Sequence, residues 1–474
     1  MRYIYIFLSV YLFTGCASKE VLHVEDSKVV ELNTTKEPPK QQEIVVANTD
    51  THLSSIKTDK EPKAIIIKDL ERIPQDVSHY LQDIKDTQKL YKVQKKYEKY
   101  YFRTWNMKKP DEKLKEAMWP FGSYKFGKNY GENFQLLKKE FFQSMLESAN
   151  FKKYATKNLY GVTLKETNIR AFPTIKPVLN DPSLAGEGFP FDYMQNSTIH
   201  ANKPILISHY SKDKAWAFIF SSFTSGWIKV SEFVVIDKKY TDTWQKAKQV
   251  RIIKEGVPIY KQDGSYLFES KIGMMFALID EDENFYTILT VSSYNNSQPL
   301  YNKSKISKGI ATKSVLTLNK TNLKNIINEV SKTNYGWGGM YEQRDCSSML
   351  RDMYAPFGIW LPRNSYQQSL VGKVNSLSKF TNDKKIKFIK EKASPFKTLL
   401  YKKGHIVLYV GTYEGEIVVF HNTWGVKTIK DGVEGRVVIG RPIFSTLNLG
   451  SNLEDYDKDA GILKNLKSMN TLTN

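Results

Sequence analysis

Hydrophobic positions recur with different periods along the chain, and the changes of period predict its domains. Between residues 63 and 158 the spacing is helical, as in "SHYLQDIKDTQKLYKVQKKYEKYYF" and "NFQLLKKEFFQSMLESANF", which predicts a small helical unit. Short apolar runs separated by turns fill residues 159–238, and a second set of such runs fills residues 239–319. Runs of this length and spacing predict two small β-barrels in tandem.

Residues 320–465 combine both periods and form the last predicted domain. Helical spacing in "CSSMLRDMYAPF" predicts a helix that begins at Cys346 and is capped by Asp345. The stretch "GHIVLYVGTYEGEIVVFHNTWG" predicts two antiparallel strands joined by a tight turn, with His405 opening the first strand and His421 closing the second. The predicted fold class is therefore multidomain α+β.

The N-terminus has the layout of an export signal. An apolar run over residues 3–13 leads to small residues and Cys16, and it is far shorter than the roughly 20 residues of a transmembrane helix. "FTGC" resembles a lipobox, which implies that residues 1–15 are a signal peptide and that Cys16 carries lipid. The polar residues 16–62 then form a flexible tether. An ordinary signal peptide and an uncleaved N-terminal anchor are the alternatives.

Composition narrows the choice of partner. The length of 474 residues suits about three domains of roughly 150 residues each, and 41% hydrophobic residues are enough to build packed cores. Seventy Lys and Arg against fifty Asp and Glu give a net charge of +20, a balance that is also found in nucleic-acid binders. The export signal argues against nucleic acid and favours an anionic cell-envelope polymer. An equally good interpretation is that the lysines only solvate the surface.

The chain holds only two cysteines. If Cys16 carries lipid, Cys346 has no disulfide partner and is either an inert core residue or a reactive thiol. The first turn of a helix favours a thiolate, because its backbone N–H groups are unpaired and the helix dipole is positive there. The same N–H groups can bind the oxyanion of a tetrahedral intermediate. We therefore predict that Cys346 is a nucleophile; no G-x-S-x-G motif supports a serine hydrolase instead.

A nucleophilic thiol needs a base, and histidine is the usual one. Of the seven histidines, only His405 and His421 belong to the last domain. Pairing of the two predicted strands would bring both imidazoles to the N-terminus of the Cys346 helix. These ligand types would also suit zinc, but the closely spaced ligand pair typical of zinc sites is missing. We predict neither a metal nor a cofactor.

Taken together, "YGWGG…RDCSSM…LPRNSYQQ…GHIVLYVG…HNTWG" resembles the NlpC/p60 family of papain-like cysteine peptidases, which cleave peptidoglycan stem peptides. The two barrels resemble bacterial SH3 domains, and "IPQDVSHYLQ" in the helical unit resembles the N-terminal stabilising domain of the γ-D-glutamyl–diamino-acid endopeptidase branch. One departure is Ser348, where the family commonly has Gly. The resemblance covers most of residues 63–465.

The resemblance implies catalytic roles. Cys346 would be the nucleophile and His405 its general base and later acid. His421 would orient His405 and fix its tautomer. Asn422 competes for that third role, because papain-like sites also use Asn and the sequence does not fix which way the strand faces.

The resemblance also implies substrate contacts. In this branch the free amine of an N-terminal L-Ala is read by the acidic residue before the cysteine and the serine after it, here Asp345 and Ser347, and by a tyrosine of the first SH3 domain. Tyr193 is our candidate for that tyrosine, with an ordinary packed loop aromatic as the alternative. For Trp337 and Arg363 we expect structural roles, in loop packing and in anchoring the segment after the helix.

We thus expect an exported, lipid-anchored, monomeric endopeptidase that cuts the γ-D-glutamyl–diamino-acid bond of murein stem peptides. One alternative is a non-catalytic murein-binding lipoprotein with a vestigial papain-like domain. Another is a wall amidase or effector with the same Cys–His chemistry. Ala17 and Ser18 favour the outer membrane for the anchor, on its periplasmic face.

Overall fold

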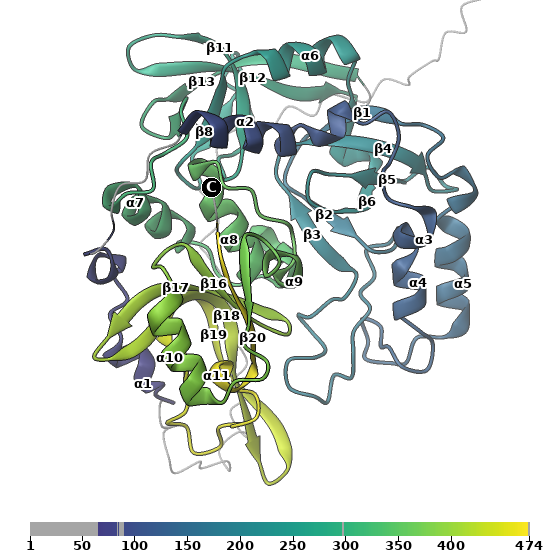
Figure 1. Cartoon of the computed structure of the whole chain (residues 1–474). Coiled ribbons are helices and arrows are strands. Elements are labelled where there is room, and N and C mark those ends of the chain that lie inside the picture. Colours follow the sequence, from purple (N-terminus) through teal and green to yellow (C-terminus); the bar gives the residue numbers. More distant parts are fainter. Residues whose placement is uncertain (1–64, 83, 85–89, 296–297, 473–474) are drawn as a thin grey trace, which may run out of the picture. The chain divides into compact units, whose positions relative to one another are not determined.

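The computed structural model describes residues 65–82, 84, 90–295 and 298–472 (Figure 1). The predicted signal peptide (residues 1–15) and the whole predicted tether (residues 16–62), including Cys16 as the predicted site of lipid attachment, lie outside these residues. Within them, no helix is long and apolar enough to span a membrane. Helices come first, two β-rich regions follow, and a mixed domain completes the chain. This order confirms the predicted multidomain α+β fold class.

The described part of the N-terminal region is helical, as predicted. Its α-helices are α1 (Lys68–Arg72), α2 (Leu90–Tyr101), α3 (Leu114–Ala117), α4 (Trp119–Ser123) and α5 (Lys139–Ser148). Their buried side chains enter the cores of other domains. Ile73 and Val77 pack into the last domain, Tyr101 and Trp105 into the second barrel, and Phe151 into the first barrel. Short amphipathic helices must bury their apolar face against another element. This region packs against all three of the domains that follow it, and its described residues between 65 and 158 are called the strap below.

The first barrel is a seven-stranded antiparallel sheet in the order β3-β2-β6-β5-β4-β1-β7. The strands are β1 (Leu159–Thr163), β2 (Thr167–Arg170), β3 (Gln195–Ile199), β4 (Pro204–Tyr210), β5 (Trp216–Phe220), β6 (Ser225–Lys229) and β7 (Phe233–Val235). Alternate residues of β4 and β5 enter two different cores: Ile207 and Ile219 pack inside the barrel, whereas Leu206 and Phe218 pack under the strap. This sheet is covered on both faces.

A helix that the sequence pattern did not predict separates the barrels: α6 (Lys238–Lys246) follows β7 directly. Its apolar face is narrow, with Trp244 as its large buried side chain. The second barrel contains a five-stranded sheet in the order β13-β12-β11-β8-β14 and the hairpin β9-β10. Its strands are β8 (Gln249–Ile252), β9 (Pro258–Tyr260), β10 (Tyr266–Glu269), β11 (Met275–Glu281), β12 (Phe285–Tyr294), β13 (Gln298–Ser307) and β14 (Ala311–Thr312).

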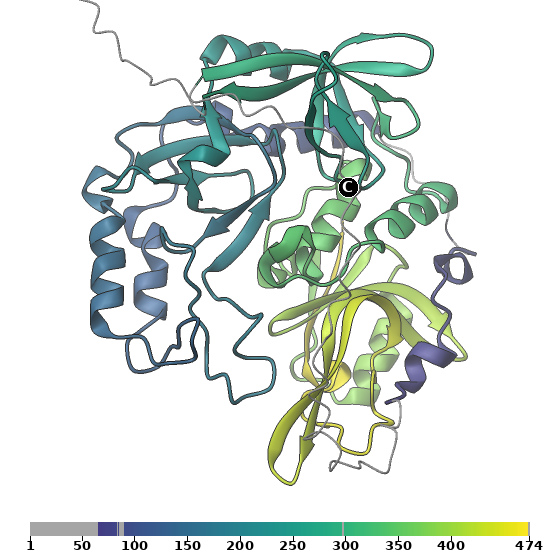
Figure 2. The same ribbon diagram turned by 180° about the vertical axis from the view of Figure 1, so that it is seen from behind.

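The last domain is a six-stranded antiparallel sheet in the order β15-β20-β16-β17-β18-β19, with helices on both faces (Figure 2). Its strands are β15 (Lys373–Ser376), β16 (Thr398–Lys402), β17 (His405–Tyr413), β18 (Glu416–Lys430), β19 (Val433–Thr446) and β20 (Leu466–Thr471). Its helices are α7 (Lys320–Val330), α8 (Cys346–Tyr354), α9 (Ser365–Gln368), α10 (Asn382–Lys392) and α11 (Ile462–Asn465). Leu408 and Phe420 face α7 and α8, whereas Val407 and Val419 face α10 and α11.

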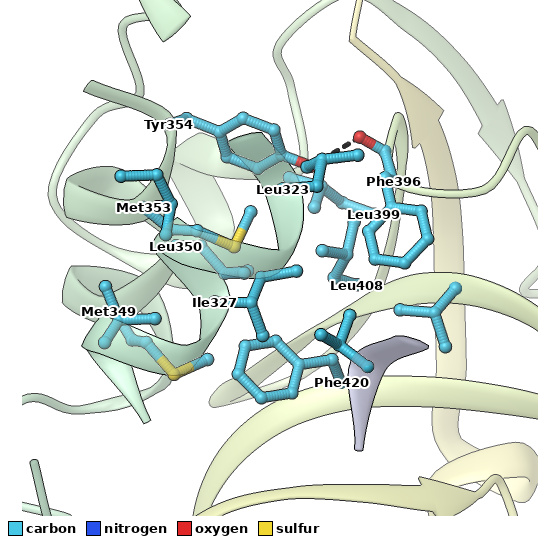
Figure 3. Packing of buried hydrophobic residues seen from close by; sticks show 14 of the residues in the cluster. Leu323, Ile327, Met349, Leu350, Met353, Tyr354, Phe396, Leu399, Leu408 and Phe420 are labelled. Atoms are coloured by element: carbon cyan, nitrogen blue, oxygen red, sulfur yellow. Dashed lines mark hydrogen bonds between the residues drawn. The ribbon is translucent and has the colours of Figure 1, made fainter. Parts of the chain in front are cut away.

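Helix α8 packs on a hydrophobic core. Figure 3 shows Met349, Leu350 and Met353 of α8 packed against Leu408 and Phe420 of the sheet. The predicted start of the helix is confirmed, because α8 begins at Cys346 and the Asp345 side chain accepts the Ser348 backbone N–H at 2.7 Å. The core therefore fixes the direction of α8, and the cap fixes where its first residue lies.

The predicted hairpin forms, but its second strand is longer than expected. β17 opens at His405, and the turn at Glu414 and Gly415 has positive φ at both residues, as a type I′ hairpin turn requires. β18 does not end at His421 but runs on to Lys430 and pairs with β19. The sequence pattern did not predict this extension.

Candidate active site

Cys346 lines a cavity of about 710 Å³ whose walls come from three parts of the chain. Contributors include Arg103 and Glu112 from the strap, Tyr193 and Asn196 from the first barrel, and Tyr335 and Arg363 from the last domain. A pocket of this size accommodates a small peptide. The predicted nucleophile therefore lies in a cavity that the barrel and the strap help to enclose.

The thiol of Cys346 is free and 7% exposed. The backbone N–H groups of Ile406 and Ser347 lie near its sulfur and act to lower its pKa, so the sulfur lies against the start of β17, one residue from His405. Burial and the Asp345 carboxylate raise the pKa of the thiol to about 12 and outweigh these two N–H groups. Burial of the site therefore favours the protonated thiol over the thiolate that the helix N-terminus was expected to favour.

A chain of hydrogen bonds orders the two histidines. His405 Nε2 lies 2.8 Å from His421 Nδ1, and His421 Nε2 lies 2.9 Å from Ser445 Oγ. The Ser445 hydroxyl donates its single proton to the Thr446 carbonyl, so its oxygen must accept from His421 Nε2–H. His421 Nδ1 then accepts from His405 Nε2–H, which leaves the lone pair of His405 Nδ1 free. This assignment follows from donor and acceptor accounting.

Both imidazoles are neutral near pH 7. Burial, with contributions from His421 and Lys402, lowers the pKa of His405 well below 6.5. Burial and Lys402 lower the pKa of His421 to about 3. Among the described residues, no hydrogen bond joins the Cys346 sulfur to His405; catalytic hydrogen bonds in empty sites are often long and tighten on substrate binding. A neutral thiol therefore lies at the start of α8, and a neutral base lies at the start of the neighbouring strand β17.

Asn422, the competitor for the third role, points elsewhere. Its Nδ2 donates to the Arg344 carbonyl at 2.7 Å, and the side chain is fully buried. Arg344 lies two residues before Cys346, so Asn422 holds the backbone that leads into α8. His421, not Asn422, contacts His405.

Asp345 and Ser347 both line the cavity beside Cys346, but Asp345 already has a cationic partner. Arg363 donates from Nη2 to Asp345 Oδ2 at 2.7 Å and from Nη1 to Oδ1 at 3.2 Å. The same guanidinium donates to Ser347 Oγ and, through Nε, to Ser197 Oγ in β3 of the first barrel. Burial opposes ionisation of Asp345, but Arg363 outweighs burial and keeps its pKa low. Arg363 therefore anchors α8 to the first barrel.

Tyr193 also lines the cavity and packs on an aromatic neighbour. Its hydroxyl donates to Glu187 Oε2 at 2.8 Å, and its ring centroid lies 5.3 Å from that of Trp337. Trp337 Nε1 donates to the Asp192 carbonyl at 3.0 Å. The structural role expected for Trp337, loop packing, fits these contacts, and Tyr193 is both a wall residue and a packed aromatic.

The loop that carries Trp337 approaches the barrel closely. Gly338 and Gly339 both have positive φ, and a Cβ at Gly339 would lie 2.2 Å from Thr198 Oγ1 of β3. Only glycine permits both the backbone conformation and the approach. The "YGWGG" stretch thus closes the cavity between the last domain and the first barrel.

Sequence reasoning missed two residues of the site. Tyr335 lines the cavity, and burial, followed by the nearby Cys346 and Asp345, raises the pKa of its phenol well above its usual value, so the phenol stays protonated and can donate. Ser445, fully buried in β19, fixes the tautomer of His421. Tyr335 could have been proposed from the sequence, because it belongs to the turn-rich "YGWGG" stretch before Cys346. No sequence feature near Ser445 indicates its role.

The described residues contain no group of three or more His, Cys, Asp or Glu side chains arranged to hold a metal ion.

Four protein-family profiles match the chain in succession. They are the NLPC_P60 stabilising domain, N term, over residues 5–154; the SH3 domain (SH3b1 type) over residues 177–229; the SH3 domain of SH3b2 type over residues 237–283; and the NlpC/P60 family over residues 332–433. A search of curated protein sequences gives no match.

Solved structures share the fold. An NlpC/P60 endopeptidase from Photobacterium damselae subsp. piscicida matches with a TM-score of 0.72 and 24% identity, over 84% of this chain and 97% of that chain. An NlpC/P60 family protein from Bacillus cereus ATCC 10987 matches with a TM-score of 0.41 and 15% identity, over 58% of this chain and 81% of that chain. Together with the four profiles, the first of these likenesses confirms the resemblance noted in the sequence. Along the chain, the profiles thus identify an NLPC_P60 stabilising domain and two SH3 domains ahead of a domain of the NlpC/P60 family.

Proposed function

We propose that this protein is a cysteine peptidase that hydrolyses the γ-D-glutamyl–diamino-acid bond of peptidoglycan stem peptides. Family members are papain-like cysteine peptidases, and the solved relative is described as an endopeptidase. The observation that carries the proposal is the free Cys346 thiol at the N-terminus of α8, beside the start of β17, where His405 begins a hydrogen-bonded His405–His421–Ser445 chain.

The geometry supports a two-step hydrolysis. His405 Nδ1 takes the thiol proton as the sulfur attacks the carbonyl, and it then gives that proton to the departing amine. Water, deprotonated by the same nitrogen, releases the acyl group. His421 keeps His405 in the right tautomer and shares the positive charge that develops on it. Tyr335 is our candidate donor to the oxyanion, because its phenol lies in the cavity beside the sulfur.

Asp345, Ser347 and Tyr193 line the same cavity as Cys346, and in this proposal they bind the acyl part of the substrate. The Arg363 pair leaves Asp345 with little net charge for a substrate amine. In this proposal Ser347 and Tyr193 therefore act mainly through hydrogen bonds, and the pair of Asp345 with Arg363 keeps them in place.

The test is product analysis. Purified muropeptides that bear a free N-terminal L-Ala should be split after γ-D-Glu, and mass spectrometry should find the dipeptide L-Ala-γ-D-Glu. A sugar-linked muropeptide is the second substrate: release of its intact stem peptide from the sugar, with the free peptide left uncut, would instead indicate a wall amidase.

We also propose that the protein is exported and anchored in the cell envelope through lipid on Cys16, a residue outside the described structure. Cys16→Ser should move the protein from the membrane fraction to the soluble fraction without loss of activity in vitro. Acyl chains contribute about 0.8 kcal/mol per buried CH₂ to membrane binding, so the shift should be nearly complete. Fractionation with immunoblotting measures it, and unchanged membrane association would point to an uncleaved helix or a partner protein.

A further inference from the structure

Three carboxylates line the active-site cavity, and they differ in their partners. Asp345 pairs with Arg363, and Asp111 pairs with Arg103. Glu112 is the third, and no Lys, Arg or His side chain of the described residues lies within ion-pair distance of it. The cavity wall thus presents two neutralised carboxylates and one that lacks a cationic partner.

Glu112 is held in place by groups that do not neutralise it. Its Oε2 accepts the Ser225 hydroxyl at 2.8 Å, and Ser225 lines the same cavity. Its backbone carbonyl accepts the Tyr154 hydroxyl at 2.7 Å. The side chain is half-buried, and burial raises the pKa of its carboxyl group. The Arg103 guanidinium acts on this carboxyl group from nearby, but its ion pair is with Asp111. A positioned, partly desolvated carboxylate without an ion-pair partner gains from a cation that enters the cavity.

We propose that Glu112 is a specificity residue that binds a primary ammonium group of the substrate. The inference rests on the proposed peptidase function and extends it, because it gives the stabilising domain a direct part in substrate recognition. The strap then does more than hold the barrels and the last domain together: through Glu112 it completes the substrate cavity.

Two ammonium groups of a stem peptide could supply the cation. One is the N-terminal amine of L-Ala, and the other is the side-chain amine of the diamino acid. Both have the same chemistry, and the experiment must separate them. A charge-assisted hydrogen bond of this kind corresponds to roughly a tenfold to hundredfold change in binding.

The variant is Glu112→Gln, which keeps the shape and the Ser225 contact but removes the charge. The matched control is Glu147→Gln on α5 of the same region, whose side chain is 73% exposed and lies outside the cavity. Thermal unfolding of both variants checks that the fold is intact. Three substrates are compared: L-Ala-γ-D-Glu-diaminopimelate, its N-acetylated form, and an analogue with 2-aminopimelate, which lacks the side-chain amine.

The proposal predicts that wild type cleaves one of the two amine-deficient peptides roughly tenfold to a hundredfold more slowly than the parent. Glu112→Gln should slow the parent to that same rate and leave the deficient peptide unchanged, while Glu147→Gln behaves as wild type. The peptide affected identifies which amine Glu112 binds. If Glu112→Gln keeps the wild-type discrimination, or slows all three peptides equally, the inference is wrong.

A binding measurement tests the ammonium site independently of peptide hydrolysis. Calorimetry with the same peptides is carried out in a Cys346→Ala background, with and without Glu112→Gln. If wild type cleaves none of the peptides, the proposed function fails, but amine-dependent binding that Glu112→Gln removes would still support the ammonium site. Binding that does not depend on either amine would overturn it.

Discussion

Cys346→Ala is expected to abolish peptide hydrolysis, with a loss on the order of 10⁴-fold or more in kcat. The sulfur is the atom that forms the acyl intermediate, and no other cysteine lies in the described residues. The fold should survive, because alanine fits the first turn of α8 and the Asp345 cap stays in place. We expect a loss of about 1 kcal/mol in the free energy of unfolding, since one buried sulfur is removed.

The natural control is Cys16→Ser, which removes the other cysteine of the chain and should leave turnover in vitro unchanged. Turnover is followed by peptide cleavage, and folding by thermal unfolding. A Cys346→Ala protein that is folded and still cleaves at more than a few percent of the wild-type rate would end the assignment of the nucleophile.

His405→Ala should be nearly as damaging, because the thiol is protonated in the empty site and cannot attack without a base. Members of one catalytic unit are not additive, so loss of one removes most of its effect. His421→Ala should cost about 10²-fold or more, since the tautomer and orientation of His405 are then free to change. The measurement is kcat/KM across pH.

The dependence of activity on pH should follow the ionisation of His405. His405 works as a neutral base, and its pKa lies below 6.5, so wild-type activity should be constant at neutral pH and fall only in acid. Asn422→Ala is the matched control: it should lower stability, because the Arg344 carbonyl loses its donor, and keep the shape of this profile. A profile that changes with Asn422 but not with His421 would reverse their roles.

Local patterns predicted those parts of the site that depend on local structure. Cys346 at the start of a helix follows from apolar spacing and an N-cap, and His405 at the start of a strand follows from the turn at Glu414 and Gly415. Both lie within one element, where period and capping are decisive.

Local sequence patterns could not predict the contacts between segments that are distant in the sequence. Arg363 looked like an anchor, but its ion pair with Asp345 and its bond to Ser197 depend on how the last domain meets the first barrel. Ser445 joins His421 only because β18 continues past that residue and pairs with β19. Glu112 lies more than two hundred residues before Cys346 in sequence, and only the closed cavity brings it to the substrate.

The strap illustrates the same limit. Its helical period was plain, yet the period does not say which surface each helix covers. Ile73 packs on the last domain and Trp105 on the second barrel, a division that depends on the surfaces the other domains present. The apolar face of an amphipathic helix indicates that the helix packs against another surface, but it does not identify that surface.

The most direct test of the central claim is mass spectrometry of L-Ala-γ-D-Glu-diaminopimelate after incubation with the purified protein and with its Cys346→Ala variant. The account predicts that the wild-type protein alone produces L-Ala-γ-D-Glu and free diaminopimelate, through a thioester of the dipeptide on Cys346 that adds the mass of the acyl group to the protein. Intact peptide with folded wild-type protein, or the same products from Cys346→Ala, would contradict it.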